Sequence, residues 1–277
     1  MAKRDKLEFG KCKVCGLYKV LTEEHIPPKS TFNKGTIKII NADEAMKTIT
    51  DKNRLPWDFD GLKYKLKQGG RTFKTLCSTC NSYFGTNYVN HYQINANSLA
   101  YSLSQITMDK CESINVRSEN FRPLPFIKQV IAMFASITNI ADDVNVKDFL
   151  LNKDNNNFDK SKLRIYMSIF KDGLNRLFGW SALYCKNGTY LVSEIVSYPF
   201  IFVLLGNADE HTEQDCKHLG VDITSFLDFK YEDETSIEIS LPLHECNINL
   251  PCDYRSKKEI LKCTQKKSNN KQIDGKE

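Results

Sequence analysis

The 277-residue sequence predicts an α+β protein, and three features indicate that class. Two C-x-x-C pairs enclose a stretch with strand and turn signals in the first third of the chain. The run PFIKQVIAMFASIT, residues 125–138, has the apolar spacing of a helix. Residues 163–243 then hold β-branched and aromatic runs separated by turn signals, which is typical of an antiparallel sheet.

Residues 1–95 form the first predicted domain. The segment KYKLKQGGRTFKTL, residues 63–76, alternates apolar and polar residues on both sides of Gly69 and Gly70, which predicts a two-stranded ribbon with a tight turn. Its second strand runs directly into Cys77, and a helix is expected to begin between Ser78 and Asn81. A further strand is expected at TIKII, residues 36–40.

The four paired cysteines, Cys12, Cys15, Cys77 and Cys80, predict a structural zinc site. Each C-x-x-C turn supplies two thiolates, and two such turns complete the tetrahedron that zinc prefers. The alternative is four unrelated free thiols. A redox function is disfavoured because neither pair follows a strand in a βαβ setting. Four thiolates leave no open position, so this zinc would stabilise the fold rather than take part in a reaction.

The second predicted domain covers residues 96–254, and a basic tail covers residues 255–277. Residues 96–155 are expected to be helical, with a second helix at NVKDFLLNK, residues 145–153. The strands expected over 163–243 form an antiparallel sheet with helices to one side. The end of the lysine- and asparagine-rich tail is expected to be flexible.

Composition and charge bound the class of protein. A hydrophobic content of 41% and a charged content of 26% are typical of a soluble globular chain. The sequence has no apolar run long enough to cross a bilayer and no secretion signal at its start, so a cytoplasmic protein without membrane contact is expected. Residues 1–90 hold 17 Lys and Arg against 9 Asp and Glu, which suggests that this end meets a polyanion.

The order CKVC, EEHIPPK, TLCSTCN resembles the HNH endonucleases, the ββα-metal nucleases with a four-cysteine zinc site. The resemblance covers residues 10 to 90. It implies that His25 is the general base that takes a proton from water. It also implies that Glu24 and Asn81 bind a catalytic Mg²⁺ or Mn²⁺ ion beside the scissile phosphate. Such a protein would hydrolyse phosphodiester bonds in DNA, with RNA not excluded, and would serve defence against foreign DNA, including antiviral defence.

Lys29, Arg71 and Lys74 are the nearest candidates for binding the nucleic-acid backbone. A solvated lysine face is the alternative. Two residues depart from the family pattern: Glu24 stands where Asp is more common, and Thr72 stands where many relatives have Asn. These departures keep open a zinc-stabilised nucleic-acid-binding protein without cleavage activity. An adaptor that makes only protein contacts is a third possibility. The sequence assigns no function to the C-terminal domain. Target recognition, docking of a protein partner or of a second copy as a homodimer, and restraint of the nuclease are its candidate roles.

Overall fold

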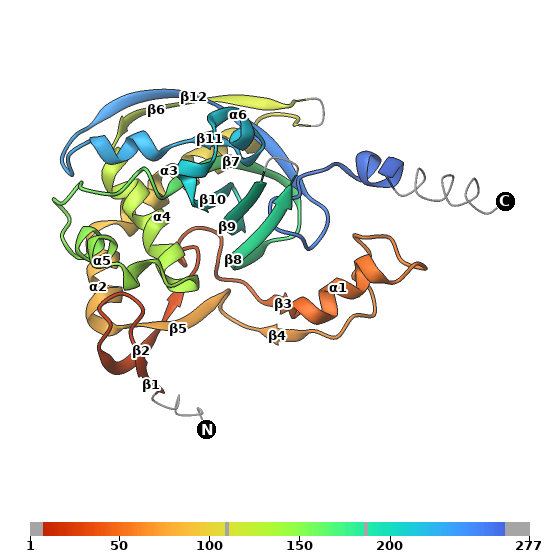
Figure 1. The fold of residues 1–277 in the computed structure, drawn as a ribbon, viewed down its shortest axis with the longest axis horizontal. Coiled ribbons are helices and arrows are strands. Elements are labelled where there is room, and N and C mark those ends of the chain that lie inside the picture. Colours follow the sequence, from red (N-terminus) through yellow and green to blue (C-terminus); the bar gives the residue numbers. More distant parts are fainter. Residues whose placement is uncertain (1–7, 109–110, 186–187, 264–277) are drawn as a thin grey trace.

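The computed structural model describes residues 8–108, 111–185 and 188–263. It is a mixed α+β fold with a small sheet near the N-terminus and a large sheet built from the second half of the chain (Figure 1). The α+β class expected from the sequence is confirmed. In the ranges that the structure describes, no helix is both long and apolar enough to cross a membrane.

The small sheet has the strand order β1-β2-β5, and both of its pairs are antiparallel. The chain leaves β5 directly into helix α2, as the sequence predicted. The bounds are β1 Glu8–Lys11, β2 Tyr18–His25, β5 Thr72–Cys77 and α2 Ser78–Asn87. This arrangement places the end of β2 opposite the start of β5, because His25 is paired with Thr72.

An arm extends from the small sheet between β2 and β5 (Figure 1). It consists of strand β3 Ile37–Ile39, helix α1 Ala42–Thr50 and strand β4 Lys65–Lys67, and β3 pairs with β4. The strand expected at residues 36–40 is therefore present. The predicted hairpin over residues 63–76 is wrong, because β4 pairs with β3 whereas β5 pairs with β2.

Gly69 and Gly70 turn the chain between those two sheets. Both have positive φ, 81° and 88°. A Cβ at Gly70 would meet the carbonyl oxygen of Asn33 at 2.3 Å, so only glycine fits there. The Asn33 side chain bonds the backbone N–H and C=O of Arg71. The glycine pair thus serves a close approach to the 27–33 loop rather than a hairpin turn.

The large sheet has the order β6-β12-β7-β10-β9-β8, with β11 paired to β7. All of its pairs are antiparallel except β12 with β7. The strands are β6 Ser113–Phe121, β7 Arg164–Gly173, β8 Arg176–Cys185, β9 Gly188–Ser197, β10 Phe200–Gly206, β11 Val221–Asp222 and β12 Thr235–Cys246. The strands expected over residues 163–243 are confirmed by β7, β8, β9, β10 and β12.

The helices of the second half are α3 Val89–Ser104, α4 Pro123–Ile137, α5 Val144–Leu151 and α6 Glu213–Cys216, and the short 3₁₀ turns are η1 Ile140–Asp142, η2 Ala208–Glu210, η3 Lys217–Leu219 and η4 Thr224–Asp228. The predicted helices at residues 125–138 and 145–153 correspond to α4 and α5. The expectation that residues 96–155 are helical throughout is wrong at β6. That segment alternates exposed and partly buried residues, as a strand does.

Helix α4 lies at the centre of the hydrophobic core, and residues Pro123 to Ser136 of this helix are all buried. Its cluster reaches the small sheet and helix α2 through Ile26, Leu76 and Phe84. It reaches the large sheet through alternate residues of β7 and β10. A second cluster, which includes α6 and η3, covers the other face of the large sheet. Structure is therefore present on both faces, whereas helices on one side were expected.

The basic tail predicted for residues 255–277 lies only partly within the described residues. Residues 257–263 are helical, and residues 264–277 lie outside the described ranges. The Lys257 ammonium lies 5.8 Å from the ring centre of Trp57 in the arm.

Candidate functional site

Four cysteines meet where the small sheet joins helix α2. Cys12 and Cys15 lie in the turn between β1 and β2, Cys77 ends β5, and Cys80 lies in the first turn of α2. Their sulfur atoms all lie within 4.8 Å of one another, and Cys15 Sγ is 3.9 Å from Cys77 Sγ. A tetrahedral zinc with Zn–S bonds of about 2.3 Å sets sulfur–sulfur distances of about 3.8 Å. The cluster thus fits a metal ion such as zinc.

Local backbone bonds hold these thiols in place. The Gly16 N–H donates to the Cys12 carbonyl at 2.9 Å, and Gly16 has φ 75°, which completes the first knuckle. The Cys77 N–H donates to Cys12 Sγ at 3.4 Å. A hydrogen bond from Cys80 lowers the pKa of Cys12 to about 4, and the same interaction raises the pKa of Cys80. The first thiolate of a metal site therefore forms readily at Cys12.

A cavity of about 540 Å³ lies between β2, the start of α2 and helix α4. Glu24, His25 and Asn81 all line it. The predicted general base and both predicted ion ligands therefore line the same cavity. Lys29 also lines the cavity, together with Lys34, which the sequence did not single out.

His25 is half-buried, and its Nε2 lies 2.9 Å from the Gly69 carbonyl oxygen. A carbonyl can only accept, so Nε2 carries the proton in this contact. The neutral ring then keeps Nδ1 as the nitrogen that can accept a proton. The Gly69 carbonyl thereby selects one tautomer and fixes the ring orientation.

Glu24 is 8% exposed, although it carries a carboxylate. Burial raises its pKa to about 7, opposed by hydrogen bonds from Ser136 and Thr75. The Thr75 hydroxyl donates to Oε1 at 2.8 Å. A carboxylate in such a place is costly to ionise unless a cation lies beside it.

Asn81 is held against the end of β2 by its amide nitrogen. Nδ2 donates to Thr22 Oγ1 at 3.1 Å and to the Glu23 carbonyl at 3.2 Å. These two bonds use both N–H groups and leave Oδ1 as the side-chain atom that can bind a cation. The oxygens of Glu24 and Asn81 are hard donors, which suit Mg²⁺ or Mn²⁺.

Helix α4 forms the opposite wall of the cavity through Gln129, Ala132, Met133 and Ser136. Gln129 is 5% exposed, and its Oε1 is buried without a hydrogen-bond partner in the part of the chain that the structure describes. Such orphaned acceptors are rare and costly in folded proteins. The sequence interpretation treated this helix as core and missed Gln129. The signal was the adjacent pair Lys128-Gln129 within an otherwise apolar run.

Arg71 and Lys74, the other predicted backbone-binding residues, do not line this cavity. The Lys74 ammonium lies 3.7 Å from the Glu8 carboxylate. Burial lowers the pKa of Arg71 to about 10, and its Nη1 lacks a partner among the described residues. Thr72, which departs from the family pattern, is also buried with an unpartnered hydroxyl. Of the three basic candidates, only Lys29 is placed with Glu24 and His25.

Comparisons with protein-family models, with curated proteins and with solved structures found no match to this chain. The class that the fold defines is therefore an α+β protein with a four-cysteine cluster able to hold a metal ion.

Proposed function

We propose that the protein is a metal-dependent endonuclease of the HNH type that hydrolyses phosphodiester bonds in DNA. The single observation that carries the proposal is that one cavity is lined by His25, Glu24 and Asn81. An imidazole and two hard oxygen donors are the groups that this chemistry needs. The motif over residues 10 to 90 supports the same function.

In this proposal His25 takes a proton on Nδ1 from the attacking water while Nε2 remains bonded to Gly69. Glu24 and Asn81 Oδ1 would hold a divalent ion, and Lys29 and Lys34 would face the phosphate backbone. When bound, the ion neutralises the charge that develops on the phosphate and the departing oxygen. The cysteine centre fixes the start of α2 and so the position of Asn81.

Gln129, on helix α4, is a further residue of the proposed site. It lines the cavity from that helix, and its amide oxygen is buried and lacks a partner among the described residues. A donor on the substrate or an ordered water would satisfy that oxygen. We therefore assign Gln129 to positioning of the substrate.

One observation favours a second candidate, a zinc-stabilised nucleic-acid-binding protein without cleavage. The Glu24 carboxylate is engaged by Thr75 and its pKa is raised to about 7, so protonation competes with ion binding. The basic residues at the cavity would then bind backbone without any reaction.

Plasmid cleavage separates the two candidates. Supercoiled plasmid is incubated with the purified chain and Mg²⁺ or Mn²⁺, beside the His25→Ala variant. Loss of a general base is expected to lower the nicking rate by about 10²–10⁴-fold. His218→Ala is the matched control, since His218 is exposed and does not line the cavity. A wild-type chain that leaves plasmid intact with either ion, or a His25→Ala chain that cuts normally, would refute the nuclease function.

A further inference from the structure

The β3–β4 ribbon of the arm is exposed on both faces. Its register pairs Ile37 with Lys67, Lys38 with Leu66 and Ile39 with Lys65. Leu66 is 66% exposed, and Tyr64, just before β4, is 50% exposed. A two-stranded ribbon without a covered face is only marginally stable in water. These exposed apolar side chains are therefore available to pack against a binding partner.

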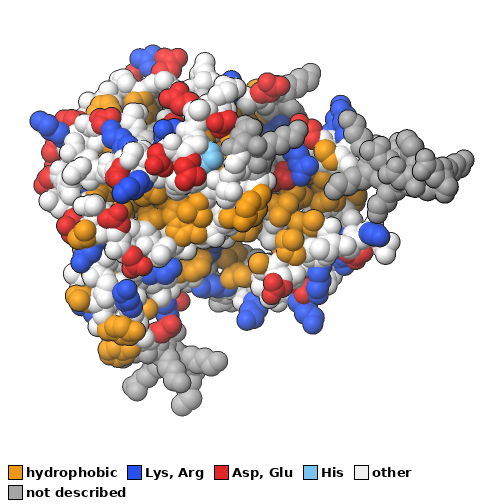
Figure 2. Space-filling view, viewed as in Figure 1, with side chains coloured by type: hydrophobic (Ala, Val, Ile, Leu, Met, Phe, Trp, Pro, Cys, Tyr) orange, Lys and Arg blue, Asp and Glu red, His pale blue; other side chains and the backbone are white. Residues whose placement is uncertain are grey.

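Lysines alternate with those apolar residues. Lys38 and Lys65 are exposed, and within the described ranges neither forms an ion pair with a carboxylate. The Lys38 ammonium instead lies 4.8 Å from the centre of the Tyr64 ring. Lys and Arg side chains project along the lower edge of the arm in Figure 2. The ribbon therefore offers cationic charge that no carboxylate of the described residues neutralises.

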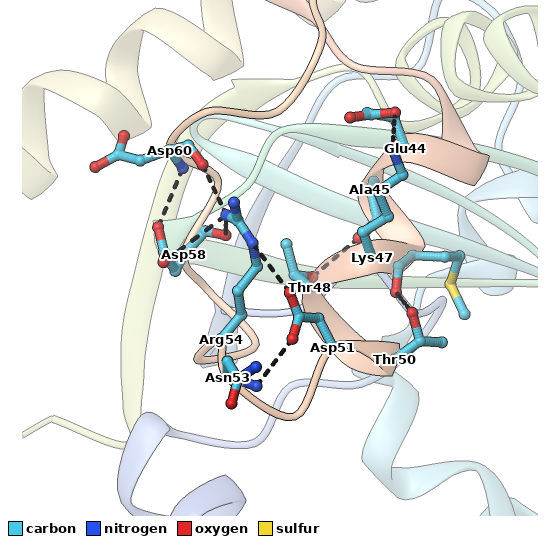
Figure 3. A network of polar contacts seen from close by, with 11 residues as sticks. Glu44, Ala45, Lys47, Thr48, Thr50, Asp51, Asn53, Arg54, Asp58 and Asp60 are labelled. Atoms are coloured by element: carbon cyan, nitrogen blue, oxygen red, sulfur yellow. Dashed lines mark hydrogen bonds and ion pairs between the residues drawn. The ribbon is translucent and has the colours of Figure 1, made fainter.

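Glu44, Asp51 and Asp58 of the arm form ion pairs with other residues of the arm (Figure 3). The Arg54 guanidinium lies 3.6 Å from the Asp51 carboxylate and 3.8 Å from that of Asp58. Glu44 accepts from Lys47 at 2.7 Å. The other Glu44 oxygen accepts from the Lys63 backbone N–H at 3.0 Å, so this carboxylate lies near the start of β4. None of these three carboxylates forms an ion pair with Lys38 or Lys65 in the described ranges.

We infer that the β3–β4 ribbon binds duplex DNA by entering the major groove. That groove is about 12 Å wide in B-DNA and admits a two-stranded ribbon, whose strands lie about 4.8 Å apart. Lys38 and Lys65 bind phosphates, while Tyr64 and Leu66 contact base edges and thymine methyl groups. The deep, narrow major groove of duplex RNA excludes such a ribbon, so DNA is the partner.

The ribbon is tied to the cavity at its base. Lys34 lines the cavity and precedes β3 by three residues. The Gly70 N–H donates to the Gly35 carbonyl at 2.8 Å, directly beside Gly69, which holds His25. Residues 34 to 38 span at most about 14 Å when extended, or about four base pairs of B-DNA. One duplex can therefore contact both places. The inference rests on the proposed function only for what happens to the DNA after binding.

The test is DNA binding by the full chain in the His25→Ala background. Affinity for a fluorescein-labelled 30-base-pair DNA duplex is measured by anisotropy across a salt series. Lys38→Gln/Lys65→Gln is expected to weaken binding on the order of tenfold and to reduce the slope of log K against log salt by about 2. Lys47→Gln/Lys52→Gln removes the same charge from α1 and the residues after it, and is expected to change affinity less than about twofold.

Three results would overturn the inference. They are wild-type affinity in the Lys38/Lys65 variant, an equal loss in the Lys47/Lys52 control, and equal affinity of the parent chain for a matched RNA duplex. Binding is scored without cleavage, so a chain that cuts no plasmid can still pass. Conversely, a chain that cuts plasmid but binds DNA through other surfaces would refute this inference and leave the proposed function standing.

Discussion

Loss of the metal from the four-cysteine centre is expected to cost the protein about 4 kcal/mol of stability. Cys15 and Cys77 are 62 positions apart, and their sulfurs lie 3.9 Å from each other. A cross-link that closes a loop of that length removes about 4 kcal/mol of conformational entropy from the unfolded chain. Metal that remains bound to the unfolded cysteines would reduce this figure.

That free energy corresponds to a measurable change in melting temperature. Unfolding entropy of about 2.1 cal/mol/K per residue gives about 0.6 kcal/mol/K for 277 residues, so the Tm should fall by about 7 °C. The assay is thermal unfolding of the purified chain before and after a zinc chelator, with bound zinc counted by mass spectrometry. Cys77→Ser should reproduce the fall without chelator.

Cys263→Ser is the matched control, because Cys263 is an exposed free thiol. Its melting temperature should follow that of the wild type with and without chelator. A chain that purifies without zinc, or one whose Tm moves by less than about 1 °C on chelation and in Cys77→Ser, would refute the reasoning.

Three further outcomes are expected. Gln129→Met removes an acceptor that is buried without a partner among the described residues, so it should raise the free energy of unfolding on the order of 1 kcal/mol. The same substitution should slow plasmid nicking, and an unchanged nicking rate would contradict the positioning role of Gln129. Burial lowers the pKa of Lys128 from 10.5 to about 7. Between these pH values the unfolded chain binds more protons than the folded one, so the free energy of unfolding should rise with pH by up to about 1.4 kcal/mol per pH unit. Urea unfolding at several pH values should show that slope in the wild type and lack it in Lys128→Met. Glu24→Gln replaces an anionic ligand with a neutral one, and the Mg²⁺ concentration for half-maximal nicking should rise on the order of tenfold or more; an unchanged requirement would remove Glu24 from the ion site.

The sequence predicted the elements whose signals are local. Two close C-x-x-C pairs specify a cluster whatever lies between them, and the apolar spacing of residues 125–138 specifies a buried helix. Strand alternation was also read correctly on both sides of Gly69 and Gly70. Alternation alone could not predict which strand β4 or β5 pairs with, because the pairing partners lie far away along the chain.

The sequence predicted the residues of the candidate site on β2 and α2, and missed the residue on α4. His25, Glu24 and Asn81 follow from a motif within residues 10 to 90. Gln129 lies 48 positions beyond Asn81, and nothing local indicates that α4 faces the same cavity. The exposure of Lys29 and the burial of Arg71 are equally invisible in sequence, because both depend on how the 27–33 loop packs.

The continuity of the core around α4 decides how this chain can be divided. A fragment ending at residue 95 would retain the cysteines and His25 but would leave Ile26, Leu76 and Phe84 without the helix that covers them. The carboxyl of Glu24 would also become hydrated, since Ser136 and its neighbours form its cover. Grafting that fragment onto another protein would therefore transfer the motif without the α4 residues that pack against it.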